Sequence, residues 1–477
     1  MNPLTIIWIA LPFLIGFSIY LLPKVDRVLA ILIALFSLGY GFTAVLLPEP
    51  LTLHLLDQFG VTLIVDQTSG YFILTNAIVT TAVILYCWAQ QKSAFFYTQM
   101  IILHGSVNAA FIGADLISLY VALEVISIAA FLLVAYPRSD RAIWVGLRYL
   151  FISNIAMLFY LVGAILVYQA NQSFAFAGLA NAPPEAIALI SLGLLTKGGI
   201  FVSGLWLPLT HSESETPVSA LLSGVVIKAG VFPLVRMALL VPDIEPLVRL
   251  FGVCTALLGV GYAIFEKDTK RMLAFHTVSQ LGFVLAAPPV AGFYALTHGL
   301  VKSALFLIAG NLPSRNFKAL KTLPLATPLW GALAIASFSI SGVPLLSGFG
   351  AKVLTMKNLL PWQVIGMNVA ALGTAISFAK FIFLPRSSEG QMKLKPGFWP
   401  AIMLLLGGLV VANIVYYDAY TLKNLLKPLL TIALGWLLYL LVIQRITWKL
   451  PRYFEQFDHL IGVMSLMLTA LFWWGVI

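Results

Sequence analysis

The sequence predicts an all-α polytopic membrane protein with 14 to 16 transmembrane helices, and two observations lead to this fold class. Of the 477 residues, 61% are apolar, and only 10% are Asp, Glu, Lys or Arg, where a soluble domain has about 25%. A bilayer core of about 30 Å needs about 20 apolar residues per helix, and apolar runs of this length follow one another along almost the whole chain. A water-soluble fold is therefore excluded.

Sixteen segments are predicted as spans, and polar joins of about twenty residues or fewer separate them. They cover residues 3–22, 28–47, 69–90, 94–113, 115–136, 142–168, 185–207, 216–240, 247–265, 272–289, 291–312, 327–357, 362–384, 397–417, 423–444 and 459–477. Residues 1–22 have no basic flank and no small-residue cleavage site, so we expect a first span rather than a removable signal. No join is long enough for a nucleotide-binding domain.

Lys and Arg gather in alternate joins, as they do in the inner loops of membrane proteins. The basic joins carry Lys24, Arg27, Lys92, Arg138, Arg141, Lys267, Lys270, Arg271, Arg315, Lys318, Lys321, Arg386, Lys393, Lys395, Arg445, Lys449 and Arg452. The intervening joins carry Glu49, Asp57, Asp66, Asp115, Glu185, Asp243 and Glu245. Both termini are therefore expected on the outer side, and the net charge of +10 is explained by topology rather than by a nucleic-acid partner. The join 208–215 departs from the pattern because it has no basic residue.

The two cysteines, Cys87 and Cys254, both lie in apolar runs. They are too few for a disulfide framework, a four-cysteine metal site or an iron–sulfur cluster. We therefore expect no cofactor and no metal in this chain.

Ionisable side chains inside the predicted spans are the most informative residues. A charge in the hydrocarbon core costs at least a few kcal/mol unless it faces the bundle interior or a water-filled path. At about 1.5 Å per residue, Glu124, Lys197, Lys228 and Lys302 lie near the membrane midplane, and Lys352 lies deep in its span. Glu124 is the only acid at this depth, so one carboxylate faces several lysines.

For other ionisable residues in the spans, a structural role competes with a functional one. His298 and Lys302 are four residues apart on one helix face, so they form either a buried hydrogen-bonded pair or part of a proton relay. His276 follows the inner charge cluster and is either a proton-uptake group or an interfacial histidine. His104 is interpreted as a hydrogen-bonded core residue. Three cations lie near predicted span ends, and we expect their long side chains to extend to the interface (snorkelling). They are Arg148, Arg236 and Lys380.

Two spans are predicted to be broken near a lysine. Segment 327–357 is too long for one untilted span and contains Ser-Gly-Val-Pro at 341–344, shortly before Lys352. In span 185–207, two glycines follow Lys197 directly. Pro and Gly interrupt helices, so helices 7 and 12 are expected to be discontinuous.

Broken helices at corresponding places in two halves point to an inverted-repeat transporter with its sites at the midplane. Residues 94–240 and 247–385 are predicted to be two inverted five-helix repeats. Residues 1–93 would form an N-terminal three-helix region, and residues 386–477 would form the C-terminal helices.

This combination of residues suits proton transfer. A buried lysine gives up its proton more readily than an exposed one, and a nearby carboxylate opposes that loss. A lysine that alternately pairs with Glu124 and leaves it can therefore bind and release a proton. Water, histidines and serines would bridge the remaining gaps, and the serines near the ionisable positions are Ser127, Ser203, Ser223 and Ser303.

Several stretches between residues 95 and 385 are distinctive when taken together. They are Trp206-Leu207-Pro208 with His211, Thr216 to Leu222 followed by Lys228 to Val231, Asp268 to Phe275 with Ser279 to Gly282, His298 to Lys302, and Pro344 to Lys352. They resemble a family of antiporter-like membrane subunits. Mrp-type Na+/H+ antiporters share this family with the proton-pumping membrane arm of respiratory complex I and its photosynthetic relatives.

The resemblance implies roles for individual residues. Glu124, Lys197 and Lys228 would form one half-channel, and Lys352 in the broken twelfth helix would serve the exit side. A lysine at this last position is more similar to the D-type Mrp subunit, or to the complex I subunit of similar size, than to the middle pumping subunit. The chain departs from the family pattern at His276, which replaces a small hydroxyl residue, in the acidic insert 212–215, and in its length beyond fourteen helices.

Two functions agree with the resemblance. The first is a proton-translocating subunit of a multi-subunit Mrp-type monovalent cation/proton antiporter, exchanging protons for Na+ or another monovalent cation. The alternative is a proton-pumping membrane subunit of an NAD(P)H or ferredoxin:quinone oxidoreductase. A third class, a scaffold with inactive channels, would not need the midplane charges.

Both functions imply other membrane subunits as partners. No motif for a nicotinamide or a flavin is present, so an enzyme name would belong to the complex rather than to this chain. The expected location is a prokaryotic cell membrane, with a thylakoid membrane as the alternative.

Overall fold

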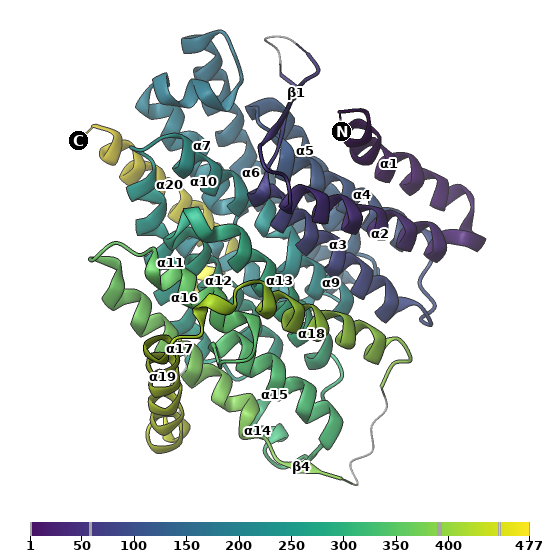
Figure 1. The fold of residues 1–477 in the computed structure, drawn as a ribbon, viewed down its shortest axis with the longest axis vertical. Coiled ribbons are helices and arrows are strands. Elements are labelled where there is room, and N and C mark those ends of the chain that lie inside the picture. Colours follow the sequence, from purple (N-terminus) through teal and green to yellow (C-terminus); the bar gives the residue numbers. More distant parts are fainter. Residues whose placement is uncertain (1, 57–59, 389–393, 447, 449, 477) are drawn as a thin grey trace.

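The computed structural model describes every residue except 1, 57–59, 389–393, 447, 449 and 477. Three residues of the predicted charge pattern, Asp57, Lys393 and Lys449, lie outside the described residues, as do the predicted chain ends 1 and 477. The described part is nearly all helical (Figure 1), as the composition predicts.

The helices follow the predicted segments closely. Up to residue 265 they are α1 (Asn2–Leu21), α2 (Asp26–Val45), α3 (Gln67–Cys87), α4 (Ala94–Ile112), α5 (Leu116–Val134), α6 (Asp140–Asn171), α7 (Pro184–Lys197), α8 (Leu207–Glu213), α9 (Thr216–Leu221), α10 (Lys228–Leu240) and α11 (Glu245–Phe265). Beyond it they are α12 (Thr269–Ala286), α13 (Ala291–Ala309), α14 (Phe317–Leu320), α15 (Thr327–Ser341), α16 (Ser347–Lys357), α17 (Gln363–Ile382), α18 (Phe398–Val415), α19 (Leu422–Leu441) and α20 (Phe457–Val476).

Each of the sixteen predicted segments coincides with one helix or with a broken helix. In the part of the chain that the structure describes, twelve helical segments are long and apolar enough to cross a membrane, and three more apolar helices are shorter. The number of helices that cross the membrane stays a prediction.

Side-chain caps fix where several helices begin. The Asp66 carboxylate accepts a hydrogen bond from Ser69 N at 2.8 Å, and the Ser69 hydroxyl accepts one from Asp66 N at 2.8 Å, which is a capping box at the start of α3. Asp115 and Asp268 cap α5 and α12 in the same position, each accepting from the backbone N–H three residues on. Such caps satisfy amide groups that a helix leaves free at its start.

Short strands occur in the joins, which the all-helical prediction did not include. β1 (Leu51–His54) pairs antiparallel with β2 (Thr62–Val65), and β3 (Leu325–Ala326) pairs in parallel with β4 (Arg386–Ser387). They are two to four residues long, too short to produce a recognisable alternation in the sequence. The Asp115 side chain accepts from Thr62 N at 2.9 Å and so ties the hairpin to the start of α5.

Two joins far apart in the sequence are built alike. Asp115, the cap of α5, forms an antiparallel bridge with Ala175, which follows α6. Asp268, the cap of α12, forms the same bridge with Asn316, which follows α13. In each join the residue after the aspartate donates its N–H to the residue before the bridge partner, at 2.9 and 2.7 Å. The second and third helices of residues 94–240 and of residues 247–385 are thus linked in the same way.

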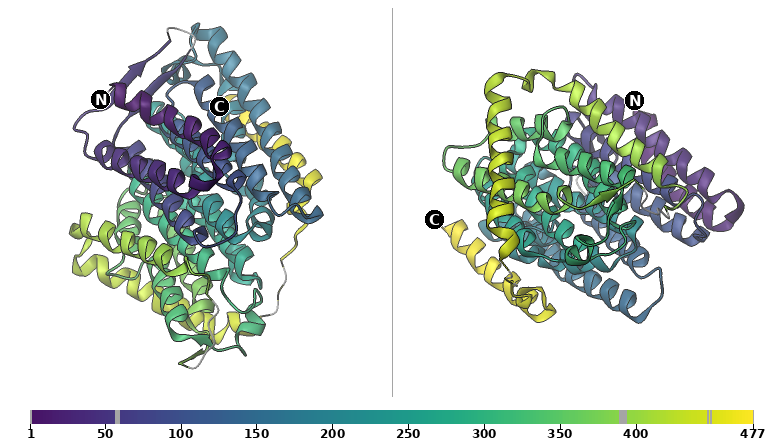
Figure 2. Two further views of the ribbon diagram at one scale, coloured as in Figure 1. Left: turned by 90° about the vertical axis from the view of Figure 1, so that its right-hand side faces the viewer. Right: turned by 90° about the horizontal axis from the view of Figure 1, so that it is seen from below.

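The two stretches occupy different parts of the molecule. In Figure 1 the helices from α4 to α10 lie mainly in the upper part and those from α12 to α17 mainly in the lower part, and Figure 2 gives the same division. The C-terminal helices connect them, because α19 packs against α17 whereas α20 returns to pack against α7. Helix α20 therefore lies beside the broken helix that carries Lys197.

Candidate functional site

Lys197 ends α7 at the predicted break. Gly198 closes the helix by donating to Leu194 O at 2.7 Å, and Gly199 takes a φ of +67°, a left-handed conformation that favours glycine. A new 3₁₀ segment then begins at Phe201 and leads into α8. Because the last carbonyls of a helix carry partial negative charge, this helix end suits the Lys197 ammonium.

The Lys197 ammonium is only 4% exposed and is held by uncharged groups. It donates to Ser153 Oγ of α6 at 2.5 Å, to Ser127 Oγ of α5, and to Leu123 O at 3.2 Å. The two hydroxyls lie 2.9 Å apart. Two neighbouring helices, α5 and α6, thus surround the buried cation of α7 with three hydrogen-bond acceptors.

Glu124 lies directly after the carbonyl that Lys197 contacts. The residue is half-buried, and its Oε1 atom is buried without a hydrogen-bond partner among the described residues. The structure therefore brings the predicted acid and lysine into one neighbourhood, with the lysine bonded to serines. An unpaired buried carboxylate oxygen costs free energy. The Glu124 Oε1 atom is therefore an acceptor that is available to a new hydrogen bond near the Lys197 ammonium.

A π-helical turn, Leu222–Val226, precedes Lys228. The N–H of Ile227 donates to Leu222 O, five residues back, at 3.2 Å, so the ordinary helical bond to Ser223 O is not made. The fully buried Lys228 ammonium donates to Ser223 O at 3.3 Å and to Gly224 O at 2.5 Å. Such turns are frequent at functional sites, and here the turn supplies carbonyl acceptors to a cation.

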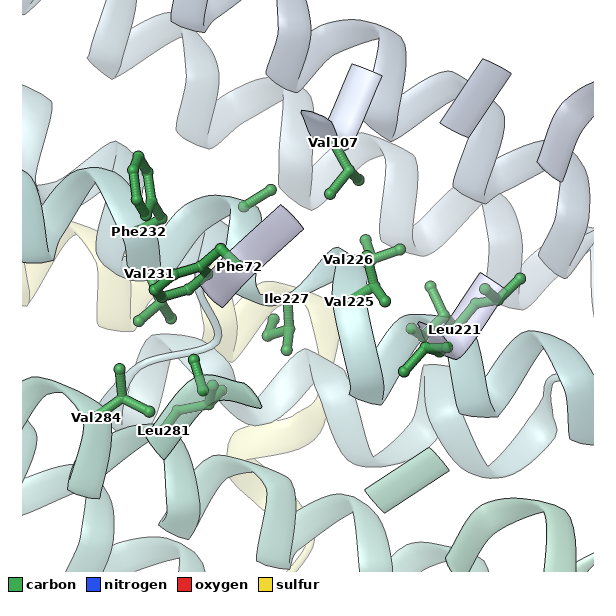
Figure 3. Packing of buried hydrophobic residues seen from close by; sticks show 14 of the residues in the cluster. Phe72, Val107, Leu221, Val225, Val226, Ile227, Val231, Phe232, Leu281 and Val284 are labelled. Carbon is green, nitrogen blue, oxygen red and sulfur yellow. The ribbon is translucent and has the colours of Figure 1, made fainter. Parts of the chain in front are cut away.

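The surroundings of this turn are apolar. Figure 3 shows Val225, Val226 and Ile227 packed with Phe72 of α3 and Val107 of α4, among the residues of the buried core. Among the described residues, the partners of the Lys228 ammonium are the carbonyls of Ser223 and Gly224 in the π-helical turn.

The histidine and lysine pair of α13 does not form a hydrogen bond. Lys302 donates to Leu273 O of α12, and both ring nitrogens of His298 lack a partner among the described residues. The hydrogen-bonded-pair interpretation is therefore wrong. His276 is likewise buried without partners, with its ring 4.6 Å from that of Phe378, and is not interfacial. Sequence position alone did not show this, because His276 follows the predicted inner charge cluster by little more than one helical turn. In the structure this part of α12 is already buried.

Lys352 lies at the second break. It donates to Ser341 O, the last residue of α15, at 3.1 Å. Gly342 takes a φ of +87°, and a Cβ added there would lie 3.0 Å from Lys352 Cδ. A small cavity of about 10 Å³ connects Lys352 with His298 and Gln280. This volume is about that of one water molecule, so the two predicted site residues share a water-sized space.

The second break is rich in free hydroxyls. Helical serines usually donate to the carbonyl four residues back, as Ser377 does to Gly373 O at 2.7 Å. At the break the buried hydroxyls have no such bond and no other partner among the described residues; they belong to Ser337, Ser339, Ser341, Ser347 and Thr355. Hydroxyls left free in this way can bond to water or pass a proton.

The cations near the span ends that are predicted to be inner reach protein partners rather than solvent. The Glu455 carboxylate, 7% exposed, accepts from Arg271 at 2.7 and 2.9 Å, and its backbone carbonyl accepts from Arg148. Lys380 donates to Glu266 O at 2.9 Å. Near the predicted outer side, Arg236 pairs with Asp66 at 2.5 Å. Snorkelling is therefore the wrong interpretation for Arg148 and Lys380, since both side chains are buried.

Glu266 lies at the centre of these inner ion pairs. Burial by itself raises the pKa of the Glu266 carboxyl, but the nearby Arg271 guanidinium and two backbone N–H groups outweigh it, so the pKa is lowered from 4.5. A lowered folded-state pKa contributes stability above the unfolded pKa, and this contribution is lost as the pH falls through the folded pKa. The pairing is therefore insensitive to pH near neutrality.

The acidic insert explains why join 208–215 lacks basic residues. Glu213 pairs with Arg141 at 3.3 Å and with Arg315 at 3.9 Å, and Glu215 pairs with Lys92 at 2.7 Å. The insert thus compensates basic residues of three other joins that are predicted to be inner, and these neighbours supply the positive excess expected of an inner join.

Other sequence predictions have clear outcomes. His104 is the predicted hydrogen-bonded core residue, with Ser37 Oγ at 2.8 Å and Thr80 Oγ1 at 3.2 Å. Ser127 contacts Lys197, whereas the hydroxyls of the other three predicted serines bond to other groups. Ser203 bonds to Ile200 O, Ser223 to Thr277 Oγ1 and Ser303 to Ala220 O. The predicted serine bridge is thus present only in part.

Two polar residues near the lysines were not predicted. Ser153 contacts Lys197, and His211 is buried with both ring nitrogens unpartnered among the described residues. Ser153 has no distinguishing sequence signal, since lone serines are common in apolar spans. His211 does have one, because it is a histidine in a stretch of apolar and hydroxyl residues.

One family matches the central part of this chain. Residues 113–377, more than half of the sequence, match the family described as "NADH:quinone oxidoreductase/Mrp antiporter, TM". The D subunit of a Na(+)/H(+) antiporter from Alkalihalophilus pseudofirmus is 27% identical over 74% of this chain and 80% of its own length. The N subunit of an NADH-quinone oxidoreductase from Desulforudis audaxviator is 30% identical over 68% of this chain and 72% of its own length.

Solved structures share the fold. A chain of the membrane-bound sulfane sulfur reductase, an archaeal respiratory membrane complex, superposes with a TM-score of 0.77 at 21% identity, covering 91% of this chain and 98% of that one. A chain of the Mrp complex from a Dietzia species gives 0.74 at 20% identity, covering 93% and 98%. At these identities the likeness shows the fold alone.

Proposed function

Because the chain belongs to the NADH:quinone oxidoreductase/Mrp antiporter transmembrane family, we propose that it is the proton-translocating subunit of a multi-subunit Mrp-type monovalent cation/proton antiporter. The relative from the Na(+)/H(+) antiporter covers more of this chain than the relative from the NADH-quinone oxidoreductase. The chain is a multi-pass membrane protein, and other membrane subunits of such an antiporter are its partners.

The observation that carries the proposal is the pairing of Lys197 with uncharged acceptors beside the open Glu124 oxygen. A buried ammonium without a counter-ion is costly, so the proton on Lys197 is exchangeable. When Glu124 is ionised and turns to Lys197, the charged lysine is stabilised. When the carboxylate takes up a proton, that stabilisation is lost, and the lysine proton moves on.

The next carriers are Lys228 and the residues of α13. Lys228 holds its ammonium on the carbonyls of the π-helical turn, and a Cβ added at Gly299 would be 3.5 Å from its Nζ, so the lysine lies against α13 beside His298. His298, with free ring nitrogens, both accepts and donates protons. Through the water-sized cavity the path continues to Lys352, with Lys302 and His276 as neighbouring groups.

The two similar joins support the division into two inverted repeats, 94–240 and 247–385, between the N-terminal region 1–93 and the C-terminal helices 386–477. Five spans separate Asp115 from Asp268, an odd number, which puts the two bridged joins on opposite sides of the membrane. The basic joins then face the cytoplasm, both termini lie outside, and the membrane is that of a prokaryotic cell.

Cation-dependent proton flux in inverted vesicles that carry the complete set of antiporter subunits tests the proposal. We expect added Na+ or another monovalent cation to collapse an imposed proton gradient with the unchanged protein. Glu124→Gln and Lys197→Ala should each slow the flux about a hundredfold, the order of effect of removing a proton-transfer group. Glu185→Gln, which removes an exposed acid of an outer join, is the matched control and should leave the flux unchanged.

Lys197→Arg separates charge from proton transfer, because arginine keeps the positive charge but does not release its proton. Full flux with Lys197→Arg would contradict the carrier role. If no cation collapses the gradient and pumping instead requires an electron donor, the chain belongs to a redox-driven complex and the antiporter proposal is wrong.

A further inference from the structure

A cavity of about 1070 Å³ opens at the inner end of the N-terminal helices. Its walls come from three predicted inner joins, namely the α1–α2 turn, the α3–α4 join and the α5–α6 join. The α1–α2 turn lies at the edge of the molecule in Figure 1, so the cavity faces the surrounding membrane as well as the inner surface. None of the midplane residues lines it.

The lining is strongly basic. Lys24, Arg27, Lys92 and Arg138 line the cavity together with a single acid, Asp26. Arg27 is fixed by Trp88 O at 2.5 Å, and Lys92 is fixed by Glu215 at 2.7 Å. These bonds hold two cations in the wall, so the positive charge is a built feature of the cavity.

The other two cations are free. Lys24 and Arg138 are exposed, and their charged groups have no hydrogen-bond or ion-pair partner among the described residues. A lysine and an arginine that line one cavity without counter-ions favour an anionic group such as a phosphate, which accepts charge-assisted bonds from both. The Asp26 carboxylate is engaged by Arg27, since its Oδ1 accepts from the backbone N–H of Arg27 and lies 3.8 Å from the Arg27 Nε.

Apolar surface continues from the cavity along the neighbouring helices. Tyr20 and Trp88 line the cavity and are 59% and 38% exposed. Next to them Leu21 and Leu22 are 75% and 56% exposed. Trp and Tyr side chains next to exposed apolar residues are typical of the level of the lipid headgroups.

We propose that this cavity binds the phosphate of an anionic phospholipid headgroup, with Lys24 and Arg138 as its direct ligands and the acyl chains along α1 and α2. A basic pocket between helices on the cytoplasmic side is suited to such a headgroup. A soluble phosphate would use the same cations but would gain nothing from the exposed apolar residues beside them.

Lipid binding to the complete antiporter assembly tests the proposal. The complex is purified in mild detergent, placed in nanodiscs of phosphatidylcholine with or without phosphatidylglycerol, and the retained lipid is measured by mass spectrometry after re-extraction. The unchanged complex should retain phosphatidylglycerol preferentially. With Lys24→Ala/Arg138→Ala, affinity should fall about thirtyfold, equivalent to about 2 kcal/mol, since each cation at the surface contributes about 1 kcal/mol.

Arg386→Ala/Arg445→Ala removes the same charge from exposed inner residues outside the cavity and is the matched control. An equal loss with this control would overturn the proposal, because it would reduce the effect to general surface charge. Displacement of phosphatidylglycerol by millimolar inorganic phosphate would show a soluble-anion site instead. Cross-linking of the Lys24→Cys variant to another protein of the complex, with no lipid retained, would show that protein covers the cavity.

Discussion

Residues 94–240 and residues 247–385 share one arrangement of helices and joins, but they surround their buried lysines with different polar groups. In both, an aspartate caps the second helix and bridges to the residues after the third, and the fourth helix is broken beside a lysine. The first stretch places its lysine beside a carboxylate and two bonded serines. The second places Lys352 among free hydroxyls and histidines, and none of its described acids lies among them.

This difference shows which feature each stretch depends on. A buried cation needs either an anion or a sufficient number of oriented dipoles. The first stretch supplies hydroxyls fixed by mutual hydrogen bonds, which hold one geometry. The second supplies unbonded hydroxyls at the helix break, including those adjacent in the chain to Ile340 and Gly348, which line the water-sized cavity. Such hydroxyls can change partners as a proton passes. We therefore expect substitution of the hydrogen-bonded partners to affect the first stretch most, and a change of backbone conformation at the break to affect the second.

Glu455→Gln should produce the largest loss of stability, because it removes the carboxylate charge that pairs with the buried Arg271 of α12. Its backbone carbonyl accepts from Arg148 of α6 and its carboxylate from Arg271 of α12. Removing one partner of a buried ion pair costs about 3 kcal/mol, measurable as a lower thermal unfolding midpoint. Glu213→Gln, which loses only partly exposed pairs, is the control and should cost less than about 1 kcal/mol. An equal loss of stability in Glu455→Gln and Glu213→Gln would contradict a special contribution of the buried Glu455–Arg271 pair.

Ser127→Ala/Ser153→Ala should have an intermediate effect. Lys197 would lose two of its three acceptors, at a cost of about 1–3 kcal/mol in the free energy of unfolding. Ser337→Ala/Ser341→Ala in the second stretch breaks no hydrogen bond and should leave stability unchanged while slowing proton flux. Denaturant unfolding of the purified protein and vesicle flux separate the two cases. If both double variants are equally destabilised, the contrast between bonded and free hydroxyls is wrong.

Gly342→Ala should give the smallest loss of stability but act on the second stretch alone. Its φ of +87° disfavours alanine by about 1 kcal/mol, and the new Cβ would lie 3.0 Å from Lys352 Cδ. We expect slower flux with a slightly lower unfolding midpoint. Gly331→Ala in the same helix is the control, because a Cβ there meets nothing within 4 Å, and alanine favours a helix. A normal flux with Gly342→Ala would show that the shape of this break is not critical.

Helix positions and family membership followed from the sequence because they depend on local composition. Apolar runs of span length predicted α1 to α7 and α9 to α13 closely, and Gly and Pro marked the breaks after Lys197 and after Ser341. The distinctive stretches predicted the family, which the match over residues 113–377 confirms. The roles of Glu124, Lys197, Lys228, Lys302, Lys352, His276 and His298 stay predictions, since no measurement on this chain tests them.

The partners of the buried charges did not follow from the sequence, because they come from segments far apart in the chain. Ser153 is 44 residues from Lys197, and Glu455 is 184 residues from Arg271. The π-helical turn before Lys228 also gave no local signal, since a helix of either kind has the same apolar pattern. His276 was assigned to the interface because Phe378, which packs against its ring, comes from α17, far along the chain.

The sequence by itself determined that this is a polytopic helical membrane protein of the antiporter-like family, and it located the ionisable residues inside the predicted spans. Hydrophobic length and charge placement are properties of single segments, so they can be found by reading along the chain. Only the tertiary structure decided which groups face each buried cation, because a hydrogen bond requires two atoms within about 3 Å. That condition is met by the packing of helices against one another.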